Sequence, residues 1–434
     1  MKSGKRTRFF LTILSFAVLV ACLGLAPTTM AAAPQKTISF WCQKWWPVGY
    51  NEGMVAAAKD FEKETGVKVD LFMAGDVEVR TKVQVAIETK TLPDVGFIMS
   101  AEPTMYHELG VLAPVTDVVN HLKKKYGGLY GDITCGKFGS QYYAVPYYSI
   151  PDVLHVRKDR FDQAGLALPQ TWDEVMAAAK KTTDAAKNIY GFGEGVGAGN
   201  VDHGKLLRTL MYSFGGGEFA KNGKTITIGS PQSLKAFAWV KEGWKAGIFP
   251  PDGTQWDSSG NNKSWLSGQA TMIWNAASTI VSTQSQAPDI YKNMAMVKVP
   301  AGPNGVRAQF SDVQNLVVFK TSKNVALAKK FIEFLFQPKY YSKWVMPSGQ
   351  PTFQSFVSDP MWNDPLLKPV IETSQYIKNM GYPGPLTPWA AEMFQRNILE
   401  QMSSEMVLKN LTPEEAAKEY IPKIKEIMNR WQKK

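Results

Sequence analysis

The chain has 434 residues and a mass of 48.2 kDa, enough to bury a large core and to form more than one domain. A hydrophobic share of 44% and a mean hydropathy of -0.20 are typical of a globular soluble protein, and 13 Trp is a high number. The net charge is +11, but Lys and Arg are scattered along the chain, which argues against nucleic-acid binding.

The first segment, residues 1–33, has the pattern of a secretory signal. Basic residues precede an apolar run at 9–26, and small residues follow. Two cleavage sites stay open. The stretch LVAC at 19–22 fits a lipobox in which Cys22 is acylated, and the small residues at 28–34 fit ordinary cleavage. We therefore expect an exported protein, either periplasmic or lipid-anchored on the outer face of the cytoplasmic membrane.

Strands and helices alternate through the first part of the mature chain. Short β-rich runs bounded by turn residues predict strands, and apolar residues at helical spacing predict helices between them. This order is typical of an α/β domain with a largely parallel sheet. The predicted strands are 36–43, 67–74 and 93–100, and the predicted helices are 51–66, 77–91 and 101–122.

The second part of the chain is more helical. A strand is expected at 140–150, and a capping box formed by Thr171 and Glu174 starts a helix over 169–184. Cys42 and Cys135 remain after export, and the sequence leaves open whether they form a disulfide or stay as two buried thiols. Further helices or helix–strand units are expected at 203–216, 230–247, 262–278, 324–344 and 412–431.

Several stretches, in this order, resemble extracellular solute-binding proteins of ABC importers. The closest resemblance is to the carbohydrate-binding branch that includes maltose-binding protein, and it covers essentially the whole mature chain. The stretches that carry it are FEKETGVKVDLFMA at 61–74, 80–100, 109–119, 141–181, WLSGQATMIWNAAS at 265–278 and 299–335.

The resemblance implies the two-lobed α/β periplasmic-binding-protein fold of type II, with a hinge crossed three times and a ligand cleft between the lobes. Crossings are expected near Pro146, Ala295 and Val345. The resemblance also implies a monomeric receptor, not an enzyme, that binds a sugar or oligosaccharide and delivers it to the permease subunits of the transporter. The lobes are then 35–146 plus 295–345 and 147–294 plus 346–434.

The stretch FWCQKWWPVGYNEG at 40–53 raises the question of why so many Trp stand in a loop. It follows the first predicted strand, so it lies at the carboxyl end, where α/β sheets bind ligands. Aromatic rings cover the apolar faces of sugars while polar groups bind the hydroxyls. We predict that Trp45 and Trp46 face the cleft and that Trp41 belongs to the core. Packing of all three in the core stays open.

Two further stretches are expected to contribute to the cleft. Tyr147 and Tyr148 point to opposite sides of an extended strand, so one should face the ligand. Adjacent tyrosines bind ferric iron in related proteins, but the 4 His show no cluster, so no metal is expected. GEGVGA at 193–198 matches the dinucleotide pattern only loosely, so no cofactor is expected. We predict a cleft loop with Glu194 and Asn200 as contacts.

The remaining candidates follow other predicted strands or match the family. By resemblance, Trp274 stacks on the sugar with Asn275 beside it, and a core role for Trp274 is the alternative. Phe394 competes with Trp389 for a late stacking position. The other predicted site residues are Ser100, Glu102, Trp256, Asp257, Ser311, Asp312 and Trp389.

Two other classes of function stay open. A secreted glycoside-active enzyme would need two cleft carboxylates at a suitable separation, and no motif ties together any two of the predicted ones. A peptide or polyamine receptor of the same fold is the second alternative. A polyamine site would be rich in acidic groups, whereas aromatic residues dominate the predicted cleft.

Overall fold

The computed structural model describes most of the chain after the predicted signal. Lys36–Lys434 form one compact unit. Three predicted features lie outside the described residues, namely the signal at 1–33 with Cys22, Trp46 and Cys135. The described residues are 36–45, 48–130, 136–346 and 349–433.

The larger sheet has six strands in the order β13-β6-β12-β3-β1-β2. The three predicted strands of the first part are confirmed, and β1 pairs in parallel with both β2 and β3. The expectation of a largely parallel sheet holds for this half only, because β12 is antiparallel to β3 and β6. The strands are β1 (Thr37–Gln43), β2 (Lys68–Ala74), β3 (Val95–Met99), β6 (Val145–Ile150), β12 (Asp312–Val318) and β13 (Gln350–Pro351).

The smaller sheet has four strands in the order β10-β7-β9-β8. Strand β9 is central and buried along almost its whole length, antiparallel to β7 and parallel to β8. The strands are β7 (Asp152–Arg157), β8 (Tyr190–Phe192), β9 (Ala270–Ala276) and β10 (Met294–Val297).

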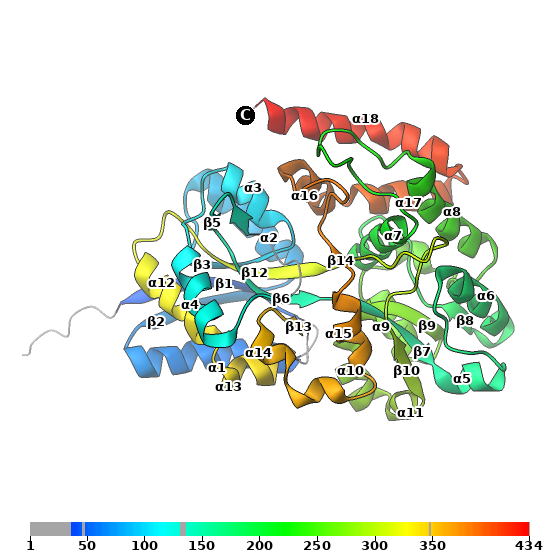
Figure 1. Ribbon diagram of the computed structural model, residues 1–434, viewed down its shortest axis with the longest axis horizontal. Coiled ribbons are helices and arrows are strands. Elements are labelled where there is room, and N and C mark those ends of the chain that lie inside the picture. The colour runs from blue at the N-terminus through cyan, green and yellow to red at the C-terminus, as the bar shows by residue number, and fades with distance from the viewer. Residues whose placement is uncertain (1–35, 46–47, 131–135, 347–348, 434) are drawn as a thin grey trace, which may run out of the picture. The chain divides into compact units, whose positions relative to one another are not determined.

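The chain passes from one sheet to the other later than the expected crossings. Pro146 lies within β6, and only Pro151 separates β6 from β7 (Figure 1). Ala295 pairs with Val156 inside the smaller sheet, and the chain returns to the larger sheet at β12. After Val345 the chain still contributes β13 to the larger sheet.

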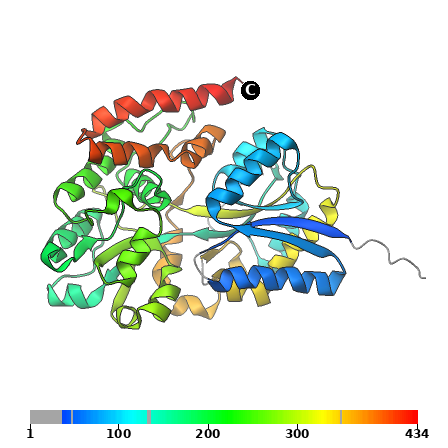
Figure 2. The same ribbon diagram turned by 180° about the vertical axis from the view of Figure 1, so that it is seen from behind.

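Helices cover the larger sheet where the apolar periodicity predicts them. Helix α1 packs on β2 and on α12, and Figure 2 shows it along one face of the sheet. The helices around this sheet are α1 (Val48–Thr65), α2 (Asp76–Thr89), α3 (Glu102–Glu108), α4 (Thr116–Tyr126) and α12 (Val325–Leu335).

Helices also surround the smaller sheet. The predicted capping box of Thr171 and Glu174 is confirmed at the start of α6, which packs on β8 and β9. In Figure 1, α18 lies beside α8 and α17, with which it is in contact. The helices of this part are α5 (Lys158–Gln163), α6 (Trp172–Thr182), α7 (Val201–Ser213), α8 (Pro231–Lys245), α9 (Gly260–Leu266), α10 (Thr279–Gln286), α16 (Pro388–Gln395), α17 (Ile398–Leu408) and α18 (Pro413–Gln432).

Cys42 lies on β1 and is a free thiol, fully buried in the hydrophobic core on one face of the larger sheet. Burial raises the pKa of this thiol to about 12, so the group stays protonated. For Cys42 the structure therefore agrees with the free-thiol alternative. None of the helices in the described ranges is long and apolar enough to cross a bilayer.

Candidate functional site

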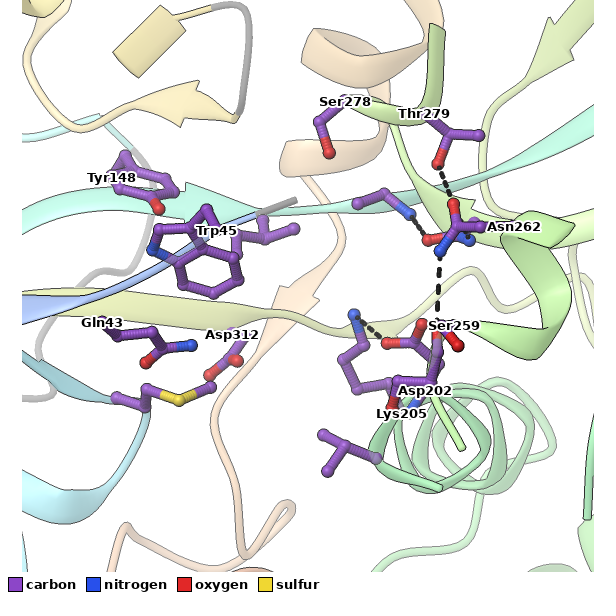
Figure 3. Close-up of a pocket in the computed structure, with 16 residues that line it drawn as sticks. Gln43, Trp45, Tyr148, Asp202, Lys205, Ser259, Asn262, Ser278, Thr279 and Asp312 are labelled. Carbon is purple, nitrogen blue, oxygen red and sulfur yellow. Dashed lines mark hydrogen bonds and ion pairs between the residues drawn. The ribbon is translucent and has the colours of Figure 1, made fainter. Parts of the chain in front are cut away.

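A cavity of about 480 Å³ lies between the strand ends at one end of the larger sheet and the first turns of α7, α9 and α10. Its volume falls in the range of roughly 300–1,000 Å³ that small-molecule sites occupy. Figure 3 shows two walls that face each other across an open space. The lining residues are Gln43, Trp45, Met99, Tyr148, Ile150, Val201, Asp202, Lys205, Ser258, Ser259, Asn262, Asn275, Ala276, Ser278, Thr279 and Asp312.

The first wall is built from strand ends of the larger sheet. Gln43 and Met99 are the last residues of the parallel strands β1 and β3, so they lie at the same end of the sheet. Asp312 is the first residue of β12. Because β12 runs antiparallel to β3, its first residue lies at the same end of the sheet as the last residue of β3. Tyr148 on β6 and Trp45 after β1 complete this wall. The ends of strands in an α/β sheet are where ligands commonly bind.

Trp45 is fixed before any ligand arrives. Its backbone N–H donates to Asn51 Oδ1 at 2.9 Å, and Asn51 Nδ2 donates to its carbonyl at 2.8 Å. Its indole makes edge contacts with Tyr50, Phe97 and Tyr148, with ring centroids 6.5, 6.4 and 6.2 Å away. The ring therefore presents an ordered apolar surface to the cavity at little entropic cost.

The second wall is polar and comes from the first turns of helices and from the end of strand β9. Asn262 Oδ1 accepts from Asn275 Nδ2 at 3.2 Å and from Thr279 Oγ1 at 3.1 Å. Behind Asn275, His155 Nε2 lies 3.3 and 3.2 Å from the carbonyls of Asn275 and Ala276 and donates to them. Burial lowers the pKa of His155 to about 4, so the ring is neutral and holds this strand end in place.

An ion cluster closes the lower part of this wall. Lys205 Nζ lies 3.0 Å from Asp152 and 3.0 Å from Asp202, and its side chain is only 7% exposed. Burial raises the pKa of Asp152 to about 6, against the opposing effect of Lys205, and nearby Asp202 raises it further. Burial alone would lower the pKa of Lys205, but the two carboxylates raise it, so this lysine remains charged.

The structure brings four of the predicted site residues together. Trp45, Tyr148, Asn275 and Asp312 line the cavity. Trp46 lies outside the described residues.

Trp256 and Asp257 line a separate hollow instead, together with Gln255, Lys263 and Gln269. There Asp257 accepts from Ser259 N–H at 2.9 Å, a local turn contact, and these hydrogen bonds lower its pKa. Trp256 and Asp257 were predicted to face the cleft, but from this loop it is Ser258 and Ser259 that line the cavity.

Two predicted aromatic residues are core residues. Tyr147 is 1% exposed, and its ring packs against Phe336 and Tyr341. Alternation along β6 sends it to the side opposite Tyr148. Trp274 is 1% exposed and packs against Trp172, with ring centroids 5.3 Å apart. Neither of them lines the cavity.

Glu102 ties two helices together. Its Oε2 accepts from Met99 N–H at 2.9 Å, and its Oε1 accepts from Gln395 Nε2 of α16 at 2.9 Å. Glu102 was predicted as a site residue, but it takes part in the contact between α3 and α16 and does not line the cavity.

Three other predicted residues are also used in packing. Ser100 is 4% exposed, with its backbone in the left-handed region at φ 43°. Ser311 is 5% exposed beside the cavity residue Asp312. Trp389 donates its Nε1–H to the Gly223 carbonyl at 3.1 Å, and its rival Phe394 is 4% exposed in the same core cluster. None of these three predicted residues lines the cavity.

Asn200 and Glu194 lie behind the second wall. Asn200 Oδ1 accepts from the N–H groups of Asp202 and His203, so it caps α7 and fixes the first turn that carries Asp202 and Lys205. Glu194 is 0% exposed, and burial raises its pKa well above the usual value. Neighbouring Asp202 raises it further, so the buried site favours the protonated carboxyl.

Replacing Glu194 by Gln is expected to stabilise the fold increasingly as the pH rises. Because its pKa is raised in the folded chain, the carboxyl holds a proton there that the unfolded chain releases, so wild-type stability falls by up to about 1.4 kcal/mol per pH unit above the usual pKa. Glutamine ionises in neither state. Urea unfolding at about pH 5 and pH 7 measures the difference. The exposed Glu108→Gln is the matched control, and a Glu194→Gln difference that does not change with pH would contradict the protonated state.

Several cavity residues were not predicted from the sequence. Asp202 and Lys205 lie just before and just inside the predicted helix at 203–216, and neither belongs to a recognised motif. The best signal for them was the capping residue Asn200, since a capped first turn in an α/β fold often faces a ligand. The cavity residues not predicted are Gln43, Met99, Ile150, Val201, Asp202, Lys205, Ser258, Ser259, Asn262, Ala276, Ser278 and Thr279.

Comparisons with known proteins agree with this architecture. A curated relative, the multiple sugar-binding protein of Streptococcus mutans, is 22% identical over 346 residues, which cover 77% of this chain and 79% of that protein. The structure of an ABC transporter solute-binding protein from Thermotoga lettingae, bound with α-D-tagatose, has a TM-score of 0.78 and 24% identity and covers 90% of this chain and 99% of that chain.

A second solved structure gives the same result. A sugar transporter protein from Arthrobacter chlorophenolicus with bound laminaribiose has a TM-score of 0.77 and 21% identity, covering 90% of this chain and 99% of that chain. These likenesses show the two-lobed fold. The family model for bacterial extracellular solute-binding proteins matches residues 48–341, which is more than half of the sequence. The chain therefore belongs to the family of bacterial extracellular solute-binding proteins.

Proposed function

We propose that the protein is the extracytoplasmic receptor of an ABC importer and that it binds a sugar, oligosaccharide or polyol in the cavity. It acts as an exported monomer, periplasmic or lipid-anchored, and delivers its ligand to the permease subunits. Family membership supports the receptor role. The sugar ligands named for the related proteins support the ligand class.

The observation that carries this proposal is the pairing of the two walls. An ordered indole, Trp45, faces a wall of amide and hydroxyl groups from Asn262, Ser278 and Thr279 across the cavity (Figure 3). A sugar ring has an apolar C–H face that suits the indole and hydroxyls that suit the polar wall. A site with mostly apolar lining and a few placed polar groups is the usual design for a small ligand.

The strand connections support a hinge between two lobes. The sheets are joined at Pro151, between β10 and β12, and after β13. We propose that the lobes are those predicted, with boundaries moved to these points. Closure of the lobes on the ligand is then the signal that the permease reads, as in other hinge proteins.

The enzyme alternative has less support than the receptor. Of the four predicted cleft carboxylates, Asp312 lines the cavity, whereas Glu102, Glu194 and Asp257 do not. Asp202 does line it but is bound to Lys205 at 3.0 Å. A peptide or polyamine receptor of the same fold is distinguished from a sugar receptor by experiment.

A thermal-shift screen of sugars, polyols, polyamines and peptides tests the proposal, because a ligand that binds only the folded state raises its stability. We expect a carbohydrate to raise the melting temperature without being converted. Product formation, followed by chromatography of each hit, would support the enzyme. Stabilisation by polyamines or peptides alone would overturn the carbohydrate receptor.

Trp45→Ala is expected to weaken binding of the sugar identified in this screen by about 1–3 kcal/mol, because an aromatic contact with the ligand is lost. Titration calorimetry measures the change. Trp41→Ala is the matched control, because that ring packs against Phe72 and Lys82 and does not line the cavity. Equal affinities of wild type and Trp45→Ala would show that this indole is not part of the site.

A further inference from the structure

Strand β12 carries a glutamine, Gln314, on the face of the larger sheet that borders the cavity. Residues directly opposite each other in an antiparallel pair point to the same face, and so do residues two apart on one strand. Gln314 lies opposite Met99 on β3 and opposite Tyr148 on β6. Asp312 stands two residues before it on β12. All three neighbours line the cavity, so Gln314 lies between them at the cavity floor.

The indole of Trp45 lies across the same part of the sheet. Its ring contacts Phe97 on β3 and Tyr148 on β6, with ring centroids 6.4 and 6.2 Å away. Because β12 runs between β3 and β6, a ring that contacts both strands crosses β12. Phe97 lies opposite Leu316, which is two residues beyond Gln314. The indole therefore crosses β12 next to Gln314, and Figure 3 shows it beside Tyr148 on this wall.

The amide of Gln314 is buried without a hydrogen-bond partner within the described residues. The residue is 0% exposed, and both Nε2 and Oε1 are unpaired. Across the same ranges, the Nε1–H of Trp45 is also buried without a partner. Burying a polar group without a hydrogen bond is costly. Two such groups next to each other at a cavity floor indicate a ligand that bonds to them.

Other buried glutamines of the fold are bonded to the protein itself. Gln350 Oε1 accepts from Ser149 Oγ at 3.2 Å, and Gln309 Nε2 donates to the carbonyl of Asp152 at 2.8 Å. Both glutamines are 0% exposed, as Gln314 is. An apolar side chain of similar length would fill the place of Gln314 without the cost of an unpaired amide. The amide at this position therefore points to binding and not to packing.

We propose that Gln314 is a specificity-determining residue whose amide recognises two adjacent hydroxyl groups of a sugar that lies on Trp45. One hydroxyl accepts from Nε2–H and its neighbour donates to Oε1. A pair of hydroxyls matches an amide because it can both accept and donate, whereas a carboxylate only accepts and an ammonium group only donates. The flexible side chain of Met99, which lines the cavity next to Gln314, turns aside to admit them. The inference rests on the proposed function, because it names the feature of the carbohydrate that this site recognises.

Monodeoxy sugars test this inference. Titration calorimetry first measures glucose, galactose, mannose, maltose and cellobiose, and then the monodeoxy forms of the parent sugar that binds. Removal of either hydroxyl of one adjacent pair should weaken binding to the wild type about tenfold or more. In Gln314→Met, which keeps the length of the side chain without the amide, the parent sugar should bind about tenfold or more weakly. The penalty for removing either of those two hydroxyls should then fall to about twofold or less. Penalties that are the same in Gln314→Met and the wild type would overturn the inference.

The stability of the ligand-free protein separates a ligand role from a packing role. Gln314→Met should melt at the wild-type temperature or above it, because an unpaired buried amide is replaced by an apolar group. Gln350→Met is the matched control, a fully buried glutamine of the same sheet that does not line the cavity. It should melt at a lower temperature, because Ser149 Oγ loses its acceptor, and should bind sugar as the wild type does.

Two further outcomes are decisive. If Gln314→Met and Gln314→Leu both melted below the wild type or failed to fold, the amide would serve the fold and the inference would be overturned. Sugar binding that is unchanged in Gln314→Met sinks only this inference, whereas binding of no carbohydrate in the panel to the wild type sinks the proposed function as well.

Discussion

Trp274→Ala is expected to lower the free energy of unfolding by about 3–5 kcal/mol, the usual cost of removing a large buried aromatic side chain. Trp274 lies on the central strand β9 with 1% of its surface exposed, and its ring packs edge-on against Trp172. Trp172 in turn contacts Trp239, which joins α6 and α8 to the same cluster. Trp172 and Trp239 are themselves buried and packed, so we expect a cavity to remain where the indole was. Urea unfolding measures the loss.

Affinity for sugar separates the core role of Trp274 from a ligand role. If Trp274→Ala is too unstable to study, Trp274→Phe keeps most of the apolar volume and should bind sugar as the wild type does. Trp45→Ala should show the reverse pattern, with affinity reduced and the unfolding free energy changed much less. If Trp274→Ala kept normal stability but lost sugar binding, Trp274 would be a ligand contact and not only a core residue.

Local sequence patterns predicted the individual strands and helices, but not which distant strands pair with one another. Alternating strands and helices over 36–100 predict β1, α1, β2, α2 and β3, because apolar periodicity depends only on neighbours in the chain. The insertion of β12 between β3 and β6 could not be predicted this way, because pairing between distant segments leaves no local periodicity. The two-lobed architecture therefore depended on the resemblance to a family.

The site could be predicted only in part, because strand ends were easier to recognise than the side to which a ring points. Trp45 and Asp312 stand where a strand ends or begins, and both line the cavity. Trp274 was predicted to stack on the sugar, but it does not line the cavity. Strand β9 is buried on both faces, so the alternation of its side chains does not show which residues face a cleft. Asp202 and Lys205 were not predicted, because Lys205 also pairs with Asp152, which is distant in the sequence.

Arg208→Met is expected to lower the free energy of unfolding by about 3–5 kcal/mol, because it leaves buried carboxylates without their cation. Arg208 is 0% exposed and lies 3.1 Å from Glu218 and 3.2 Å from Glu400, which are also 0% exposed. The network fastens α7 to α17 at a place where Gly204 lets Glu400 approach, since a Cβ at Gly204 would lie 1.6 Å from Glu400 Oε1.

The acid dependence of this loss identifies its cause. Burial already raises the pKa of Glu400, and removal of Arg208 raises it further, so the folded variant holds a proton that the unfolded chain releases above the usual pKa. The deficit of Arg208→Met should therefore be largest near neutral pH and shrink as the pH falls. Arg430→Met is the matched control, because Arg430 also contacts two carboxylates, Glu392 and Glu426, but its side chain is 41% exposed.

An exposed pair of this kind contributes less than about 1 kcal/mol, so the Arg430 variant should unfold almost as the wild type does. Replacing Arg208 and both buried glutamates together by apolar residues should recover much of the stability, because no charge is then left unpaired. If that triple variant were as unstable as Arg208→Met, packing of the arginine against Phe310 and Phe394 would be the cause, and not its charge. The first turn of α7 carries Asp202 and Lys205 to the cavity, so the same network that stabilises the helix also fixes the charged wall of the site.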